Sequence, residues 1–322
     1  MKFYRALSRN RRAIIDHKGN IMKERTLVLF TLLSQAAIGA FVIFYLIYPW
    51  MARIVGESVT HGMIQSILLA VGAFFGLGLL ASLFHLGNPL NAWRALANLR
   101  SSWLSREILF ALVFSCLWAS VAILEWRQDG KSFIQDLLTW LAAISGLGLI
   151  YCMSRVYMLR TLQTWNSIST PLSFYINSFL SGAILVGGVL YFSFQGSPIL
   201  QASNLNIDHD LGAGLLRWIG LGGFGLLIAD LLISSLRKNR LRNDPLQSDK
   251  QKRFSLRLFT LRQSLLLLTL ACASIFVLYP HWTLSISPTI TIAAGLTLLI
   301  VLSTVEILER TLFYVTGLKR TL

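Results

Sequence analysis

Residues 62–85 read GMIQSILLAVGAFFGLGLLASLFH, an apolar run with no charged side chain before it ends at His85. A helix needs about 20 such residues to cross the hydrocarbon core of a bilayer. Seven further apolar runs in the sequence resemble this one. Each is expected to be a helix, because a backbone surrounded by lipid must make all its hydrogen bonds within the segment. The sequence therefore predicts an all-α integral membrane protein with eight transmembrane helices, at about residues 27–47, 62–85, 107–124, 134–154, 171–194, 215–236, 263–280 and 289–308.

The composition supports the same class. Of 322 residues, 55% are hydrophobic and only 13% are charged, whereas soluble domains carry about 25% charged residues. The three cysteines lie inside apolar runs without a C-x-x-C pair, so they are predicted to be structural rather than ligands of zinc or a cluster. Small residues at helical spacing are expected to mark close helix packing, as at Gly72, Gly76, Gly146, Gly148, Gly187, Gly188 and the glycines of 220–225.

The formal net charge of +15 is distributed unevenly. With eight crossings, 25 Lys and Arg residues fall on the side that holds both termini, and 4 fall on the other side. Basic loops stay cytoplasmic, so we expect an N-in, C-in protein of the bacterial inner membrane. The expected parts are a basic extension (1–26), the membrane domain (27–308) with a basic cytoplasmic loop (237–262), and a tail (309–322). In this setting the basic segments favour anionic lipid as partner, not nucleic acid.

Histidine positions argue against haem. A membrane haem takes axial ligands that usually come from facing helices. His61 and His85 lie at opposite ends of one predicted helix, 24 residues apart, which is about 36 Å. The other three histidines fall in predicted loops or tails, so we expect no haem in this protein.

The stretch between the second and third spans carries the densest candidate chemistry. A short amphipathic helix is expected from Asn88-Pro89, with Arg94 and Arg100 facing headgroups or a docked protein. His85 ends one span and Glu107 opens the next, where ionisable residues are usually functional. Together they could accept hydrogen bonds and protons from a hydroquinone. The alternative is structural, with the carboxylate favoured by the helix dipole and the imidazole reaching the interface.

Other polar residues are expected on the same face. Arg155 and Tyr157 follow the fourth span and Trp165 follows shortly after. Glu306 and Arg310 are spaced i, i+4, which favours a salt bridge at the end of a helix. Asp230, a lone carboxylate inside the sixth span, belongs to a proton path or pairs with an arginine such as Arg155.

Four stretches resemble the dimethyl sulfoxide reductase membrane anchor family of molybdoenzyme anchor subunits, within the polysulfide-reductase-like group. They are SLFHLGNPLNAWRALANLRSSWLSREI (82–108), ERTLVLFTLLSQ (24–35), MSRVYMLRTLQTWNSISTPLSFY (153–175) and EILERTLFY (306–314). The resemblance extends over nearly the whole sequence from about residue 24.

The resemblance implies an anchor and quinol-oxidising subunit that binds menaquinol and itself holds no haem or iron–sulfur cluster. Its implied partners are an iron–sulfur subunit and a molybdopterin catalytic subunit. It also places the quinol-site histidine at His85 and the essential glutamate at Glu107. Secondary candidates for quinone binding or partner docking are Arg94, Arg100, Arg155, Tyr157, Trp165, Glu306 and Arg310.

Three alternatives stay open. A related sulfite-oxidising complex would run electrons into the quinone pool and would face the cytoplasm, as the charge pattern here does. A secondary transporter would place polar groups at the bilayer midplane, often in an inverted repeat, and no repeat is visible here. A third alternative is a purely structural anchor without a quinone site.

Overall fold

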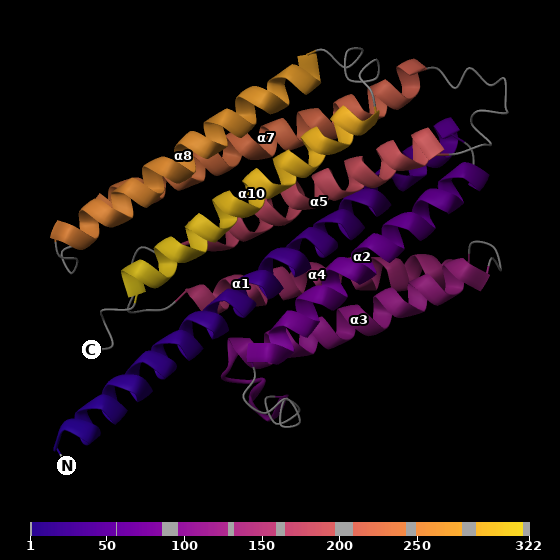
Figure 1. Cartoon of the computed structure of the whole chain (residues 1–322). Coiled ribbons are helices and arrows are strands. Elements are labelled where there is room, and N and C mark those ends of the chain that lie inside the picture. The colour runs from indigo at the N-terminus through magenta and orange to yellow at the C-terminus, as the bar shows by residue number, and fades with distance from the viewer. Residues whose placement is uncertain are drawn as a thin grey trace.

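The computed structural model describes residues 2–55, 57–85, 96–127, 132–158, 165–196, 209–242, 249–278 and 288–317. Eight α-helices fill most of these ranges, and none of the described residues forms a strand. The helices run lengthwise beside one another, with both termini toward one end (Figure 1). They are α1 (Lys2–Val55), α2 (Glu57–His85), α3 (Trp103–Arg127), α4 (Phe133–Tyr157), α5 (Ser169–Gly196), α7 (His209–Arg242), α8 (Asp249–Leu278) and α10 (Pro288–Gly317).

The all-helical class predicted from the sequence is confirmed. Seven helices, α1 to α5, α7 and α8, contain segments long and apolar enough to cross a membrane. The eighth predicted span lies within α10, where residues 288–317 are helical. The count of eight crossings and the N-in, C-in orientation stay predictions.

Helices extend further than the apolar runs. The expected loop 237–262 is helical at both ends, because α7 continues to Arg242 and α8 begins at Asp249. Residues of the expected extension and tail likewise belong to α1 and α10. Lys, Arg and Leu favour helix wherever the backbone leaves the bilayer, so hydropathy alone underestimates these lengths. The amphipathic helix expected from Asn88, with Arg94, falls mostly outside the described residues, which resume with a single 3₁₀ turn at 96–98.

The bundle has two halves that share α5. In the first half α1 packs against α2 and α5, and α3 packs against α4; in the second, α7 lies between α5 and α8, and α8 also contacts α10. The larger apolar core fills the first half, and a smaller core of Ile176, Leu180, Leu227, Leu266, Leu302 and Val305 fills the second. Successive helices alternate in direction along the bundle (Figure 1). We use the name basic end for the end of the bundle where α3, α5 and α8 begin.

Only part of the predicted small-residue packing is present. A Cβ on Gly72, Gly146 or Gly148 would touch a side chain of a neighbouring helix, whereas one on Gly76, Gly187, Gly188, Gly222, Gly223 or Gly225 would meet open space. Among the described glycines, the closest backbone approach joins α1 to α5 at Gly39 and Gly182, two positions that the glycine spacing in the sequence does not indicate. Ser178 Oγ reinforces it by donating to the Gln35 carbonyl at 2.7 Å.

We expect Gly182→Ala to destabilise the protein by about 3 kcal/mol, because the added methyl group would overlap the α1 backbone, which cannot shift cheaply. Gly187→Ala in the same helix is the matched control, since its Cβ meets nothing within 4 Å. Unfolding of the purified protein by a denaturing detergent measures both. Equal stability of the two variants would contradict the close approach.

Candidate functional site

Glu107 lies on the buried face of α3, close to the start of the helix. Ser102 caps the helix by accepting a hydrogen bond from the Ser105 N–H at 3.3 Å. Glu107 is only 4% exposed, and no hydrogen bond or ion pair joins it to another described residue. A buried carboxyl group without a protein partner is costly, so such a group is a candidate for proton exchange with a ligand.

Trp103 ties α3 to α4 beside Glu107. The guanidinium groups of Arg106 and Arg155 lie 4.2 and 4.7 Å from the centre of its ring. Arg106 also donates to the Leu99 and Arg100 carbonyls, each at 2.8 Å, and so holds the incoming turn against α3. The end of α4 and the turn before α3 are thereby fixed to the first turn of α3, one turn before Glu107.

The remaining residues of the predicted quinol site are described only in part. His85 is the last residue of α2, which brings it to the same end of the bundle as the start of α3. Its side chain and all of Arg94 lie outside the described residues. Arg100 is exposed in the turn before α3, so it is available to a partner or a headgroup.

A second group of ionisable residues lies between α5, α7, α8 and α10. Arg262 donates to both carboxylate oxygens of Asp230, at 3.0 and 2.8 Å, and to Glu309 at 2.6 Å. Arg237 donates to Glu309 at 2.5 Å and to Ser173 Oγ at 3.2 Å. We call Asp230, Arg237, Arg262 and Glu309 the charge cluster. Each is at most 3% exposed, and their charges cancel.

Four secondary candidates from the sequence lie around the charge cluster. Arg310 stacks on Phe174 at 3.6 Å and on Tyr157 at 4.9 Å from the ring centres. Its Nη2 is 3.7 Å from Glu306, as the i, i+4 spacing predicted. Trp165, fully buried, lies under the Arg237 guanidinium at 4.4 Å. Tyr157, Trp165, Glu306 and Arg310 therefore belong to a different group from Glu107 and Arg155.

Sequence reasoning missed Arg237, Arg262 and Glu309 as partners. The predicted basic cytoplasmic loop (237–262) begins and ends at these two arginines, which the structure buries. Asp230 pairs with Arg262 rather than with Arg155. A carboxylate inside a membrane span requires a partner. Asp230 was therefore the residue in the sequence that indicated a buried arginine nearby. The choice of arginine depends on how α7 and α8 pack, which the sequence did not specify.

The opposite end of the bundle carries a smaller polar contact. His61 Nδ1 lies 2.5 Å from Glu125 Oε1, and Gln135 donates to Glu125 Oε2 at 2.7 Å. This contact joins α2, α3 and α4 and uses both oxygens of a carboxylate that is 2% exposed. Its partners explain the burial of Glu125 without any ligand.

We expect Glu125→Ala to cost about 2 kcal/mol of unfolding free energy, because it leaves His61 and Gln135 without their acceptor. Asp136→Ala, an exposed acidic residue near the start of α4, should change stability by less than about 0.5 kcal/mol. Detergent-induced unfolding followed by circular dichroism distinguishes the two. A Glu125→Ala variant as stable as the parent protein would contradict the pairing of Glu125 with His61 and Gln135.

No group of three or more His, Cys, Asp or Glu side chains within the described ranges could hold a metal ion. Cys116 and Cys272 are exposed on their helices and Cys152 is buried, all with free thiols.

The family model for the DMSO reductase anchor subunit (DmsC) matches residues 18–318. The chain belongs to this family. The match spans both the Glu107 region and the charge cluster, and the membrane-spanning character of the helices agrees with a multi-pass anchor subunit.

Curated relatives carry related descriptions. The anaerobic dimethyl sulfoxide reductase chain YnfH of Escherichia coli is 33% identical over 214 residues, covering 63% of this chain and 71% of that protein. An anaerobic dimethyl sulfoxide reductase chain of Haemophilus influenzae is 32% identical over 184 residues, covering 55% of this chain and 62% of the relative. A sulfite dehydrogenase subunit of Allochromatium vinosum is 36% identical over 152 residues, 43% of this chain and 44% of that protein. No solved structure matches this sequence.

Proposed function

We propose that this protein is the membrane anchor and quinol-oxidising subunit of a dimethyl sulfoxide reductase-like molybdoenzyme complex. Electrons pass from menaquinol to an iron–sulfur subunit and then to a molybdopterin catalytic subunit. The observation that carries the proposal is the buried carboxyl group of Glu107, which pairs with no residue in the described ranges, at the end of the bundle where α2 ends in His85, in a member of this family.

In the proposed reaction, menaquinol gives up two electrons and two protons and leaves as menaquinone. His85 hydrogen-bonds one hydroxyl and accepts its proton, and Glu107 accepts the proton of the other hydroxyl; both protons pass toward water at the basic end. The electrons move to a cluster in the partner subunit. The anchor contributes binding, orientation and proton exits.

The basic end also supplies the proposed docking face. Arg100 is exposed beside the site, and Arg106 and Arg155 hold Trp103 beneath it. With the positive-inside rule this face is cytoplasmic, in the bacterial inner membrane. Arg94 and Arg100 would contact the docked subunit or lipid headgroups.

The alternative is the anchor of a sulfite-oxidising complex that reduces quinone. Its support is the resemblance to the sulfite dehydrogenase subunit, which covers less than half of this chain. The same site residues would serve quinol oxidation and quinone reduction. Only the catalytic partner and its substrate therefore distinguish the two proposed functions.

Co-purification tests the proposal. The protein, tagged and extracted from its native membranes with mild detergent, should bring an iron–sulfur protein and a molybdopterin protein with it, with iron and molybdenum detectable by mass spectrometry. A twin-arginine leader on the catalytic partner would contradict the inward-facing orientation. Recovery of the protein alone, without iron or molybdenum, would contradict the anchor function.

A further inference from the structure

A cleft with a volume of about 470 Å³ lies between α1 and α4, at the end of the bundle opposite the basic end. The last part of α1 and the first part of α4 form its walls. The residues that line it are Tyr45, Tyr48, Pro49, Ala52, Arg53, Asp136, Thr139 and Trp140. Its volume is in the range of small-molecule sites, but its walls carry charges as well as aromatic rings.

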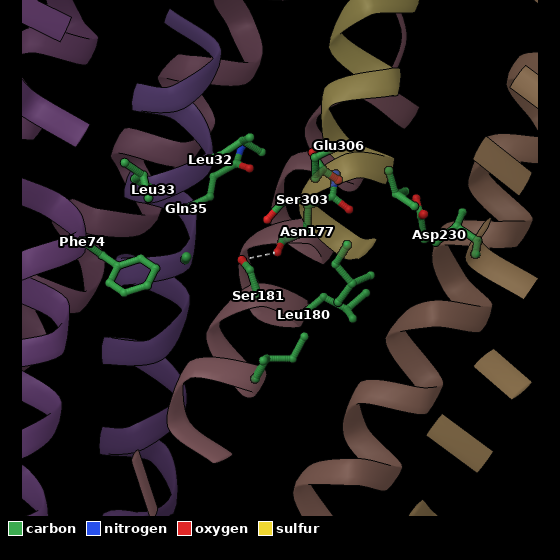
Figure 2. Close-up of a pocket in the computed structure, with 15 residues that line it drawn as sticks. Leu32, Leu33, Gln35, Phe74, Asn177, Leu180, Ser181, Asp230, Ser303 and Glu306 are labelled. Atoms are coloured by element: carbon green, nitrogen blue, oxygen red, sulfur yellow. Dashed lines mark hydrogen bonds between the residues drawn. The ribbon is translucent and has the colours of Figure 1, made fainter. Parts of the chain in front are cut away.

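A second cavity, on the other side of α1, is much smaller. About 80 Å³ is accessible between α1, α5 and α10, where Figure 2 shows Gln35, Asn177 and Glu306 around one space. This volume holds water molecules but no larger ligand. The two amide nitrogens, which have no hydrogen-bond partner among the described residues, are therefore expected to bind water. A larger ligand fits the cleft between α1 and α4.

Two opposite charges line this cleft without pairing. Arg53 is exposed on α1 and Asp136 is exposed in the first turn of α4. Within the described ranges, no ion pair or side-chain hydrogen bond joins either charged group to another residue, and the two do not pair with each other. Because the two charges cancel, the cleft favours an occupant that is neutral overall and carries one group of each sign.

Aromatic side chains place the cleft at the level of lipid headgroups. Trp140, in its wall, is 53% exposed, and Trp50 and Trp126 are exposed toward the same end of the bundle, near the ends of α1 and α3. Tryptophan is enriched where a membrane meets water. The surroundings of the cleft are therefore those of a lipid headgroup.

An exposed apolar strip runs along α4 from the cleft. Leu137, Leu141 and Ile144 are exposed and follow one another at i, i+4 and i+7, so they lie on one face of the helix. Acyl chains of a lipid whose headgroup occupies the cleft can lie along this strip. A soluble ligand with the same headgroup lacks that contact.

We propose that the cleft binds one phospholipid with a phosphoethanolamine headgroup. The lipid phosphate accepts hydrogen bonds from the Arg53 guanidinium group, and the primary ammonium group donates to the Asp136 carboxylate. Trp140 packs against the glycerol region, and the acyl chains continue along Leu137 and Leu141.

The two charges select among headgroups. Phosphatidylglycerol supplies a phosphate for Arg53 but no cation for Asp136, so the carboxylate faces a net negative ligand. The quaternary ammonium group of phosphatidylcholine has no N–H to donate. Phosphatidylethanolamine satisfies both residues, which distinguishes this cleft from the basic segments, where anionic lipid is favoured.

This binding is independent of the proposed quinol oxidation. Glu107 lies near the start of α3, whereas the cleft lies at the other end of the bundle and includes no residue of α2 or α3. Either proposal can therefore fail without the other.

Lipid titration tests the site. The full-length protein is purified in detergent, freed of lipid and titrated with phosphatidylethanolamine, phosphatidylglycerol or phosphatidylcholine of identical acyl chains. Native mass spectrometry counts the bound lipids, and soluble glycerophosphoethanolamine provides the headgroup alone. The variants are Arg53→Gln and Asp136→Asn. Their matched controls are Arg257→Gln and Asp249→Asn, which change exposed residues of α8 outside the cleft.

The parent protein should bind one phosphatidylethanolamine about tenfold more tightly than either other lipid, the factor that corresponds to one hydrogen bond to a charged group. Arg53→Gln should weaken this binding about tenfold, and Asp136→Asn should remove the preference over the other two lipids. Both controls should bind as the parent does, and an unchanged detergent-unfolding midpoint confirms that each variant is folded.

Three results would overturn the proposal. They are equal or tighter binding of phosphatidylglycerol or phosphatidylcholine to the parent protein, an unchanged preference in folded Arg53→Gln and Asp136→Asn, and binding of glycerophosphoethanolamine as tight as that of the lipid. The last result would identify a soluble ligand instead of a membrane lipid.

Discussion

Glu107→Gln should lower quinol-driven turnover of the assembled complex by at least about 100-fold, within the range ascribed to a general base. The amide keeps the size of the side chain and cannot accept the proton that quinol oxidation releases. Because Glu107 makes no hydrogen bond or ion pair within the described parts of the protein, and the amide has the same size and shape, we expect assembly to be unchanged. The measurement is quinol oxidation by purified complexes of matched stoichiometry.

Asp249→Asn provides the control for this experiment. It makes the same carboxyl-to-amide change at an exposed position in the first turn of α8. Turnover in this variant should equal that of the parent complex. Normal quinol oxidation by Glu107→Gln would remove the proton-accepting role assigned to the residue.

Glu309→Ala should have the largest effect on stability, about 3–5 kcal/mol of unfolding free energy. Glu309 accepts from both Arg237 and Arg262, so its loss leaves two buried guanidinium groups with Asp230 as their one carboxylate in the charge cluster. Breaking a buried pair costs more than the pair itself contributes, because the remaining charge is left in a low-dielectric environment. Loss of helical circular dichroism during titration with a denaturing detergent measures the change.

Asp249→Ala is the matched control, since this carboxylate is exposed in the first turn of α8. It should shift stability by less than about 0.5 kcal/mol. The loss of stability in Glu309→Gln should lie between those of Glu309→Ala and Asp249→Ala, because the amide oxygen still accepts one hydrogen bond but carries no charge. Equal stabilities of Glu309→Ala and Asp249→Ala would show that the charge cluster does not hold α5, α7, α8 and α10 together.

Local sequence determined the helical class and the position of Glu107. Both follow from patterns within one segment, namely an apolar run of bilayer length and a carboxylate at its start. The i, i+4 proximity of Glu306 and Arg310 was predictable for the same reason.

Contacts between segments were not predictable in this way. Asp230 could have met any arginine at its depth, and the register of α7 against α8 selects Arg262. Gly39 and Gly182 are 143 residues apart in the sequence and meet because α1 packs directly on α5. Glycine spacing within a helix, as at Gly187 and Gly188, did not identify the residues that pack.

The most direct test of the central claim is whether quinol reduces the partner's iron–sulfur clusters through this protein. The intact complex, purified in oxidised form, is mixed with a soluble menaquinol analogue and frozen for electron paramagnetic resonance. We expect reduced-cluster signals within the turnover time, and none in the complex carrying Glu107→Gln. Clusters that stay oxidised in the parent complex, although a chemical reductant reduces them, would contradict quinol oxidation by this anchor.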